Sequence, residues 1–154
     1  MDSLAIVLGM QGHYPESVAM SREAITLESR TRGDDYYGVL MARSNLADTL
    51  YLMGDYGEAK QQLQDILARQ LRVIGATHPE TARSYYNLGC IAARTGNADE
   101  ALPLFAKAIE HLSPRNLPKL DNDPDLKPIQ KDPRFGKLAA RARQRGASEA
   151  RCPL

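Results

Sequence analysis

The sequence has few of the features that mark membrane proteins, secreted scaffolds or disulfide-rich domains. It contains two cysteines in 154 residues, and they form no Cys-x-x-Cys pair, which argues against a disulfide framework and predicts a reducing compartment. No apolar run approaches the eighteen or so residues that would suggest a membrane span. The N-terminus lacks the basic region and the cleavage site of a signal peptide. We therefore expect a cytoplasmic protein with no membrane partner.

Charge and catalytic motifs are equally sparse. The formal net charge is +1, which gives no basis for a nucleic-acid partner. The arginines near the C-terminus have no interleaved aromatic residues and indicate a solvated face. The nucleotide-binding and hydrolase motifs GxGxxG, GxxxxGK[ST] and GxSxG are absent. The three histidines do not have the spacing of metal ligands. We predict no enzyme activity, no catalytic residues, no cofactor and no metal site.

One group of aspartates superficially matches the spacing of a calcium-binding loop, namely Asp121, Asp123, Asp125 and Asp132. However, Leu126 stands where the sharp turn of that loop requires glycine, and two prolines interrupt the segment. Asp before Pro is a favourable start for a helix, because Asp can cap it and Pro suits its first turn. We therefore predict that Asp123 and Asp132 are helix N-caps.

The positive signal is an internal period. Gly12, Gly54 and Gly96 are spaced forty-two residues apart, each within a similar phrase such as Gly54-Asp55-Tyr56-Gly57-Glu58-Ala59. Apolar residues recur at three- and four-residue spacings on both sides of each glycine, which predicts two amphipathic helices per period. A fixed period of this size is typical of an array of stacked units.

Small residues also recur in register, at Ala5, Ala47 and Gly89 and again at Ser17, Ala59 and Ala101. Two helices approach closely where the side chain at their crossing is small, so these positions predict helix crossings. The expected boundaries are a repeat region at 1–112, divided into 1–33, 34–75 and 76–112, then a capping tail at 113–143 and a flexible C-terminus at 144–154. Within the tail, an apolar face from Phe135 to Ala142 is suited to covering the last repeat.

The Asn-Leu-Gly/Ala and Gly-x-Tyr/Ala-x-Glu-Ala phrases resemble the tetratricopeptide repeat (TPR). The period and the linker from Ile74 to Pro79 resemble the longer kinesin-light-chain type. Two features depart from it, since Tyr36-Tyr37 replaces the linker His-Pro in the preceding unit and Pro103 lies inside a second helix. The resemblance implies an all-α fold, a right-handed superhelix of antiparallel helix pairs, here with a short C-terminal helical cap.

The resemblance also implies a function and a site. The first helix of each repeat would line a concave groove that binds a peptide or protein segment, which makes the chain a non-catalytic protein-protein interaction module. An Asn nine residues before the repeat glycine resembles the asparagine that grips peptide backbone in this family. The implied groove residues are Asn45, Asn87, Arg83, Ser44, Asp48 and Tyr86, with Cys90 on the same wall or simply buried as a small residue.

An alternative function remains open. The Asp-Pro-Asp-Leu and Asp-Pro-Arg-Phe motifs of the tail resemble segments that follow repeats in bacterial multidomain proteins. By this alternative, the chain is the C-terminal regulatory region of a larger signalling enzyme such as a Ser/Thr protein kinase. The first helix is also expected to be short, with an outer face including Leu8 and Val18 uncovered. That face predicts either a preceding repeat or self-association.

Overall fold

Helices make up the fold. Within residues 2–112, 120 and 123–149, which are those that this computed structural model describes, the chain contains no strand. The predicted all-α fold is confirmed. The chain divides into two compact units, Met1–Ile74 and Gly75–Leu154, and each is described by itself.

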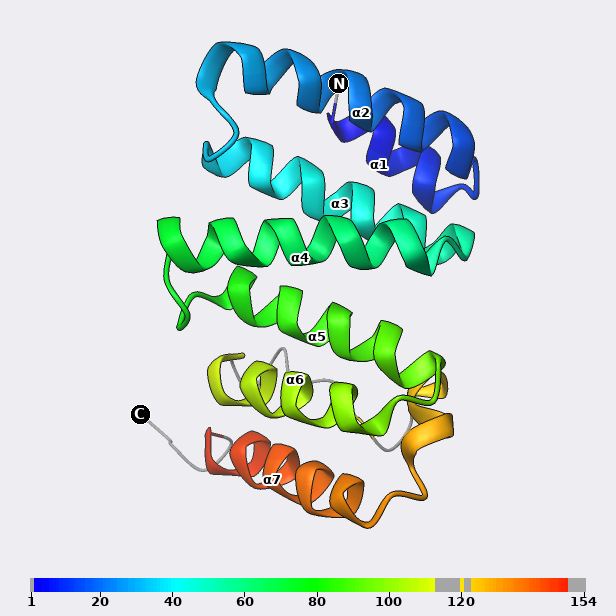
Figure 1. Cartoon of the computed structure of the whole chain (residues 1–154), viewed down its shortest axis with the longest axis vertical. Helices are drawn as coiled ribbons and strands as arrows, with labels where there is room; N and C mark the ends of the chain where they lie inside the picture. Colours follow the sequence, from blue (N-terminus) through cyan, green and yellow to red (C-terminus); the bar gives the residue numbers. More distant parts are fainter. Residues whose placement is uncertain (1, 113–119, 121–122, 150–154) are drawn as a thin grey trace. The chain divides into compact units, whose positions relative to one another are not determined.

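The first unit consists of four helices (Figure 1), namely α1 (Asp2–Met10), α2 (Tyr14–Arg32), α3 (Tyr37–Met53) and α4 (Tyr56–Val73). Helix α1 packs against α2, and α3 packs against both α2 and α4. Each pair is joined by a short turn at a repeat glycine, so the antiparallel helix pairs fall where the period predicts them.

The second unit begins with a third helix pair, α5 (Pro79–Arg94) and α6 (Ala98–His111), and continues into the 3-10 helix η3 (Pro124–Ile129) and the last helix, α7 (Pro133–Glu149). Helix α6 packs against both α5 and α7, whereas η3 packs against α5. The segment that follows the last repeat therefore turns back onto the first helix of that repeat.

The turn between α3 and α4 shows why the repeat phrase begins with glycine. Gly54 has φ 90° and ψ 4°, a left-handed conformation that costs least at glycine. Its N–H donates to Tyr51 O at 3.0 Å, which satisfies a carbonyl at the end of α3. Asp55 then caps α4, because its carboxylate accepts a hydrogen bond from Glu58 N at 3.0 Å. One dipeptide thus ends one helix and starts the next.

The cap at Asp55 can be tested by substitution. We expect Asp55→Ala to lower the free energy of unfolding by about 1 kcal/mol, because the first turn of α4 loses an acceptor for one of its unpaired N–H groups. The matched control, Asp55→Asn, keeps an acceptor at the same place and is expected to change stability little. Urea unfolding followed by circular dichroism measures both. Equal midpoints for Asp55→Ala and the wild-type chain would contradict the assignment.

The recurring small residues lie in the interior, as the crossings require. Ala59 and Ala101 have no exposed surface, and Ser17 is also buried, with its hydroxyl donating to Ala5 O at 2.7 Å. At Gly89 the two helices approach closely: a Cβ built there would lie 2.8 Å from the Phe105 ring. Helices α5 and α6 therefore pack at a distance that no larger residue at 89 would permit.

The N-terminal edge differs in part from expectation. Helix α1 has nine residues and is short, as predicted, but Val18 is buried, so the prediction that it is uncovered is wrong. The reason is that α2 packs against both α1 and α3, which leaves less of its surface free. Leu8 is half-buried. Helix α1 does carry exposed apolar side chains, at Leu4, Ile6, Val7 and Met10, and Leu27 on α2 is exposed as well.

The tail forms the predicted cap. Phe135, Leu138, Ala139 and Ala142 are buried on α7, which packs against α6. Asp123 and Asp132 are N-caps, as predicted, and accept from Asp125 N at 2.9 Å and Arg134 N at 2.8 Å. Helix α7 runs to Glu149, beyond the expected boundary at 143, while 113–119, 121–122 and 150–154 lie outside the described residues. Across the described part of the chain, no helix combines the length and apolarity that crossing a bilayer requires.

Candidate functional site

The first unit places three of the expected groove residues on α3. Asn45 and Asp48 are half-buried, one turn apart, so their polar ends lie at the edge of the packed interior. Ser44 differs from expectation, because it is 2% exposed and its hydroxyl donates to Leu40 O at 3.0 Å within the same helix. In this conformation Ser44 offers no group to a ligand, and it contributes to packing.

The second unit places the other three on α5. Asn87 is half-buried. Arg83, one turn earlier, forms an ion pair with Glu80, with Nη2 and Oε2 3.1 Å apart. The two paired atoms are buried, although the Arg83 side chain as a whole is 37% exposed. Tyr86 lies closer to the interior and has a different environment.

Tyr86 is held between two elements. Its ring lies against the ring of Phe105 on α6, with centroids 5.2 Å apart and planes inclined by 60°, a tilted arrangement that aromatic pairs favour. Its hydroxyl donates to Asp123 Oδ2 at 2.8 Å. Burial, followed by the neighbouring Cys90 and Asp123, raises the pKa of Tyr86 above its usual range, so the hydroxyl remains protonated and donates.

Asp123 therefore has two roles that use different oxygens. Oδ1 accepts from Asp125 N and caps η3, while Oδ2 accepts from Tyr86 on α5. Two residues on, the Asp125 carboxylate pairs with the guanidinium of Arg94, also on α5. The sequence predicts Asp123 as a cap, but it gives no prediction for its contact with Tyr86 or for the pairing of Asp125 with Arg94. The four-residue spacing of Tyr86, Cys90 and Arg94 puts all three on one face of α5. This spacing is the sequence feature that could have indicated a shared contact surface.

Cys90 lies on this same face and is buried. Burial raises its pKa to about 12, and the charge of Asp123 acts in the same direction. The thiolate is the nucleophilic form of cysteine, so a thiol with this pKa is unreactive at neutral pH. The alternative that Cys90 is a small buried residue is therefore supported by its environment.

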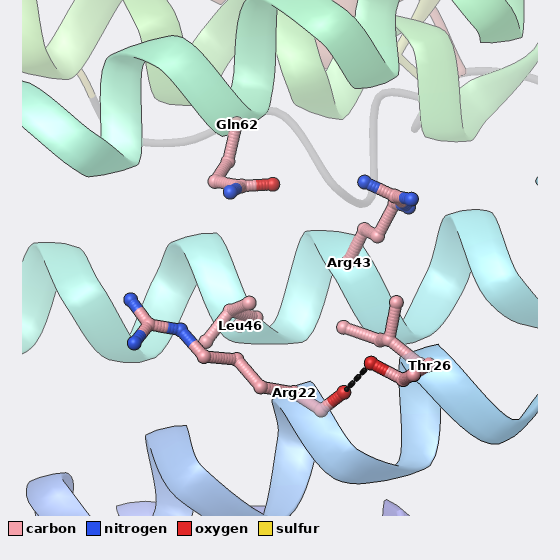
Figure 2. A pocket seen from close by; sticks show the side chains of 6 residues that line it. Arg22, Thr26, Arg43, Leu46 and Gln62 are labelled. Carbon is pink, nitrogen blue, oxygen red and sulfur yellow. Dashed lines mark hydrogen bonds between the residues drawn. The ribbon is translucent and has the colours of Figure 1, made fainter.

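The first unit also contains an open cleft of about 330 Å³ between α2, α3 and α4 (Figure 2). Gln62 reaches toward it from α4 and Arg43 from α3, while Arg22 and Thr26 lie on α2. Both arginines have acidic partners, Arg22 with Glu58 and Arg43 with Asp34. These ion pairs bridge separate segments of the unit, so the cleft is explained as a gap between packed helices.

Residues that could hold a metal ion do not gather in the described part of the chain. No group of three or more His, Cys, Asp or Glu side chains there has a suitable arrangement. Of the four aspartates that match a calcium-loop spacing, Asp123 and Asp132 cap helices and Asp125 pairs with Arg94, whereas Asp121 lies outside the described residues. What the arrangement offers chemically is a set of half-buried hydrogen-bonding groups on α3 and α5.

Antiparallel helix pairs that repeat at a fixed period, each turn ending at a left-handed glycine, define a helical repeat protein. The model of the tetratricopeptide repeat family matches residues 1–72 and 63–113. Because these ranges cover more than half of the chain, the chain belongs to the tetratricopeptide repeat family. Repeats of this family are generally protein-interaction modules.

Solved structures share the fold. A putative kinesin light chain with nearly identical TPR-like repeats from Podosopora anserina is 17% identical, with a TM-score of 0.73 over 99% of this chain and 75% of that one. BtubC (BKLC) from P. vanneervenii is 16% identical, with a TM-score of 0.78 over 98% of this chain and 63% of that one. The kinesin-light-chain-like character predicted from the period is confirmed at the level of fold.

Curated relatives are much longer than this chain. The clustered mitochondria protein homologues of Danio rerio and Homo sapiens are each 30% identical over 98 residues, which is 64% of this chain. The match spans 7% of the Danio rerio protein and 8% of the Homo sapiens protein.

Proposed function

We propose that this chain is a non-catalytic module that binds a peptide or protein segment through the first helices of its repeats. The observation that carries the proposal is the placement of amide side chains at equivalent positions: Asn45 on α3 and Asn87 on α5 are both half-buried. A carboxamide offers donors and an acceptor together, which suits the alternating groups of an extended backbone. Asp48 and Arg83 supply charge beside them.

The proposal assigns a different task to each of these side chains. Each amide, Asn45 in the first unit and Asn87 in the second, hydrogen-bonds the backbone of a segment bound to its own helix, which gives affinity that does not depend on the sequence of that segment. Arg83 selects a carboxylate, because a guanidinium presents paired N–H donors, and Asp48 selects a donor or a basic group. We place this activity in the cytoplasm, on the basis of two cysteines without a Cys-x-x-Cys pair.

The test begins with a peptide array probed with the full chain, followed by fluorescence anisotropy on the peptides that bind. We expect Asn45→Ala or Asn87→Ala each to weaken binding by about fivefold, because losing one hydrogen bond at a partly desolvated site costs about 1 kcal/mol. Gln61→Ala is the matched control, since Gln61 is an exposed amide on α4. Unchanged affinity in both folded Asn variants would move the site to another face.

Two broader proposals need their own observations. The alternative that this chain is the C-terminal regulatory region of a larger signalling enzyme, such as a bacterial Ser/Thr kinase, is tested by reading the coding sequence that surrounds it for a kinase domain in frame. Self-association through α1 is supported by the exposed side chains of Leu4, Val7 and Met10. It predicts a concentration-dependent mass in sedimentation equilibrium that Val7→Lys abolishes.

A further inference from the structure

We propose that Asp123–Ile129 is an internal ligand of α5: it occupies the face formed by Tyr86, Cys90 and Arg94, and a partner segment with the same acidic and apolar pattern displaces it. The inference rests on the proposed function, because it concerns the first helix of a repeat as a binding surface. Beyond that function, it specifies the chemistry of the segment that binds and gives a reason why binding would be regulated.

The polar contacts show how α5 reads this segment. The Tyr86 hydroxyl donates to Asp123 at 2.8 Å, and Arg94, two helical turns later on the same face, pairs with Asp125. A phenol and a guanidinium are both donors toward these carboxylates, and a charge-assisted hydrogen bond is stronger than a neutral one. The face therefore selects two carboxylates two residues apart.

The apolar contacts supply the rest of the affinity. Leu126 and Ile129 are fully buried on η3, which packs against α5. On this face of α5, Cys90 lies between Tyr86 and Arg94. When η3 covers Cys90, it excludes water from the middle of the face. The pattern recognised is thus acidic-x-acidic-apolar, followed by a second apolar residue three positions later. In this chain it reads Asp123-Pro124-Asp125-Leu126-Lys127-Pro128-Ile129.

The contact is built to be exchangeable. η3 has six residues in a 3-10 helix, whose hydrogen-bond geometry is poorer than that of an α-helix. The ion pair is partly solvated, since the Arg94 side chain is 40% exposed, and solvated pairs contribute little free energy. A tethered segment nevertheless competes strongly, because tethering gives it an effective concentration of about 1 mM. An external segment has to overcome that concentration before it binds.

The thiol of Cys90 is a natural reporter of this exchange. In a Cys152→Ser background it is the remaining cysteine, and a maleimide reacts with the thiolate of an accessible cysteine. We expect Asp123→Asn/Asp125→Asn to raise the labelling rate at least tenfold, because Asn retains the cap of η3 but removes both charges from the α5 face. Asp132→Asn is the matched control, since Asp132 also precedes a proline and caps a helix but pairs with Arg134.

A synthetic peptide with the sequence of residues 123–130 then tests recognition in trans. At about 1 mM, the effective concentration of the tethered segment, it should slow Cys90 labelling of the Asp123→Asn/Asp125→Asn chain back toward the wild-type rate. A peptide with both aspartates replaced by asparagine should not. Adding Arg94→Gln to the chain should abolish protection. No protection in a variant that circular dichroism shows to be folded would overturn the proposal and make η3 a fixed part of the core.

Hydrogen exchange on the unmodified chain provides a second measurement, independent of how the variants fold. Exchange at the amides of Leu126 and Gln130 reports how often η3 opens. We expect η3 to open at least ten times more often than α6. Equal opening frequencies in both elements would overturn the proposal. Failure here would leave the Asn45 and Asn87 experiment unaffected, whereas failure of that experiment together with success here would confine recognition to this face of α5.

Discussion

Phe105→Ala is expected to lower the free energy of unfolding of the second unit by about 3–5 kcal/mol, the range for removing a buried aromatic ring. Phe105 has no exposed surface, and its ring fills the space between the Tyr86 ring and the backbone of α5 at Gly89. Two packed helices cannot close around the missing ring without losing their other contacts. Urea unfolding followed by circular dichroism measures the loss.

The control for this prediction lies on the same helix. Glu110 is exposed, and Glu110→Ala is expected to change stability by less than about 0.5 kcal/mol, as is usual for surface positions. Phe105→Leu should fall between the two, because it retains part of the buried volume. A loss below about 1 kcal/mol for Phe105→Ala would mean that the helices repack around the site and that the aromatic contact with Tyr86 matters little.

Gly89→Ala is expected to have the next largest effect, a loss of about 1–3 kcal/mol from overpacking. This is unusual, since replacing glycine by alanine within a helix normally stabilises it by about 0.5–1 kcal/mol. The sign reverses at Gly89 because the added Cβ would lie 2.8 Å from the Phe105 ring, and that ring has no exposed surface. Thermal or urea unfolding gives the difference directly.

Gly136 provides the matched comparison. It lies in α7 of the same unit, and a Cβ there would meet nothing within 4 Å, so Gly136→Ala should show the ordinary gain of about 0.5–1 kcal/mol. In the double variant Gly89→Ala/Phe105→Leu, the smaller side chain should relieve the clash, so the two losses should not add. Strict additivity would show that the helix crossing lies elsewhere.

Much of the fold could be predicted because its determinants are local. Gly54 and Asp55 end one helix and cap the next through hydrogen bonds within three or four residues, so their spacing in the sequence carries the information. The same holds for Asp132, which caps α7 through Arg134 N. Small residues at helix crossings were also predictable, because they recur in register with the glycines.

The candidate site was less predictable because its determinants are distant in sequence. Tyr86 and Asp123 are thirty-seven residues apart, and no repeat relates the segment around Asp123 to the helices before it. Its fold-back onto α5 therefore has no periodic signal. The burial of Ser44 was not predictable for a related reason: its place in the period indicates α3, but whether its hydroxyl reaches outward or bonds to Leu40 O depends on rotamer and packing. The buried side of α2 at Val18 depends in the same way on how three helices meet.

The position of η3 against α5 has a consequence for proteins of this kind that contain more repeats. Repeat arrays are stacks of one supersecondary unit, so arrays of different length differ in the number of units. If the pair α5–α6 were duplicated in tandem, the segment that follows it would stay beside the new copy, and the original Tyr86, Cys90 and Arg94 would lose their cover. Each added helix pair would thus leave one more first helix with an uncovered face, while the face on the first helix of the last pair would stay covered by the segment that follows it. In such a lineage, the number of faces open to partners would rise with the number of repeats, and the terminal repeat would retain its own occupant.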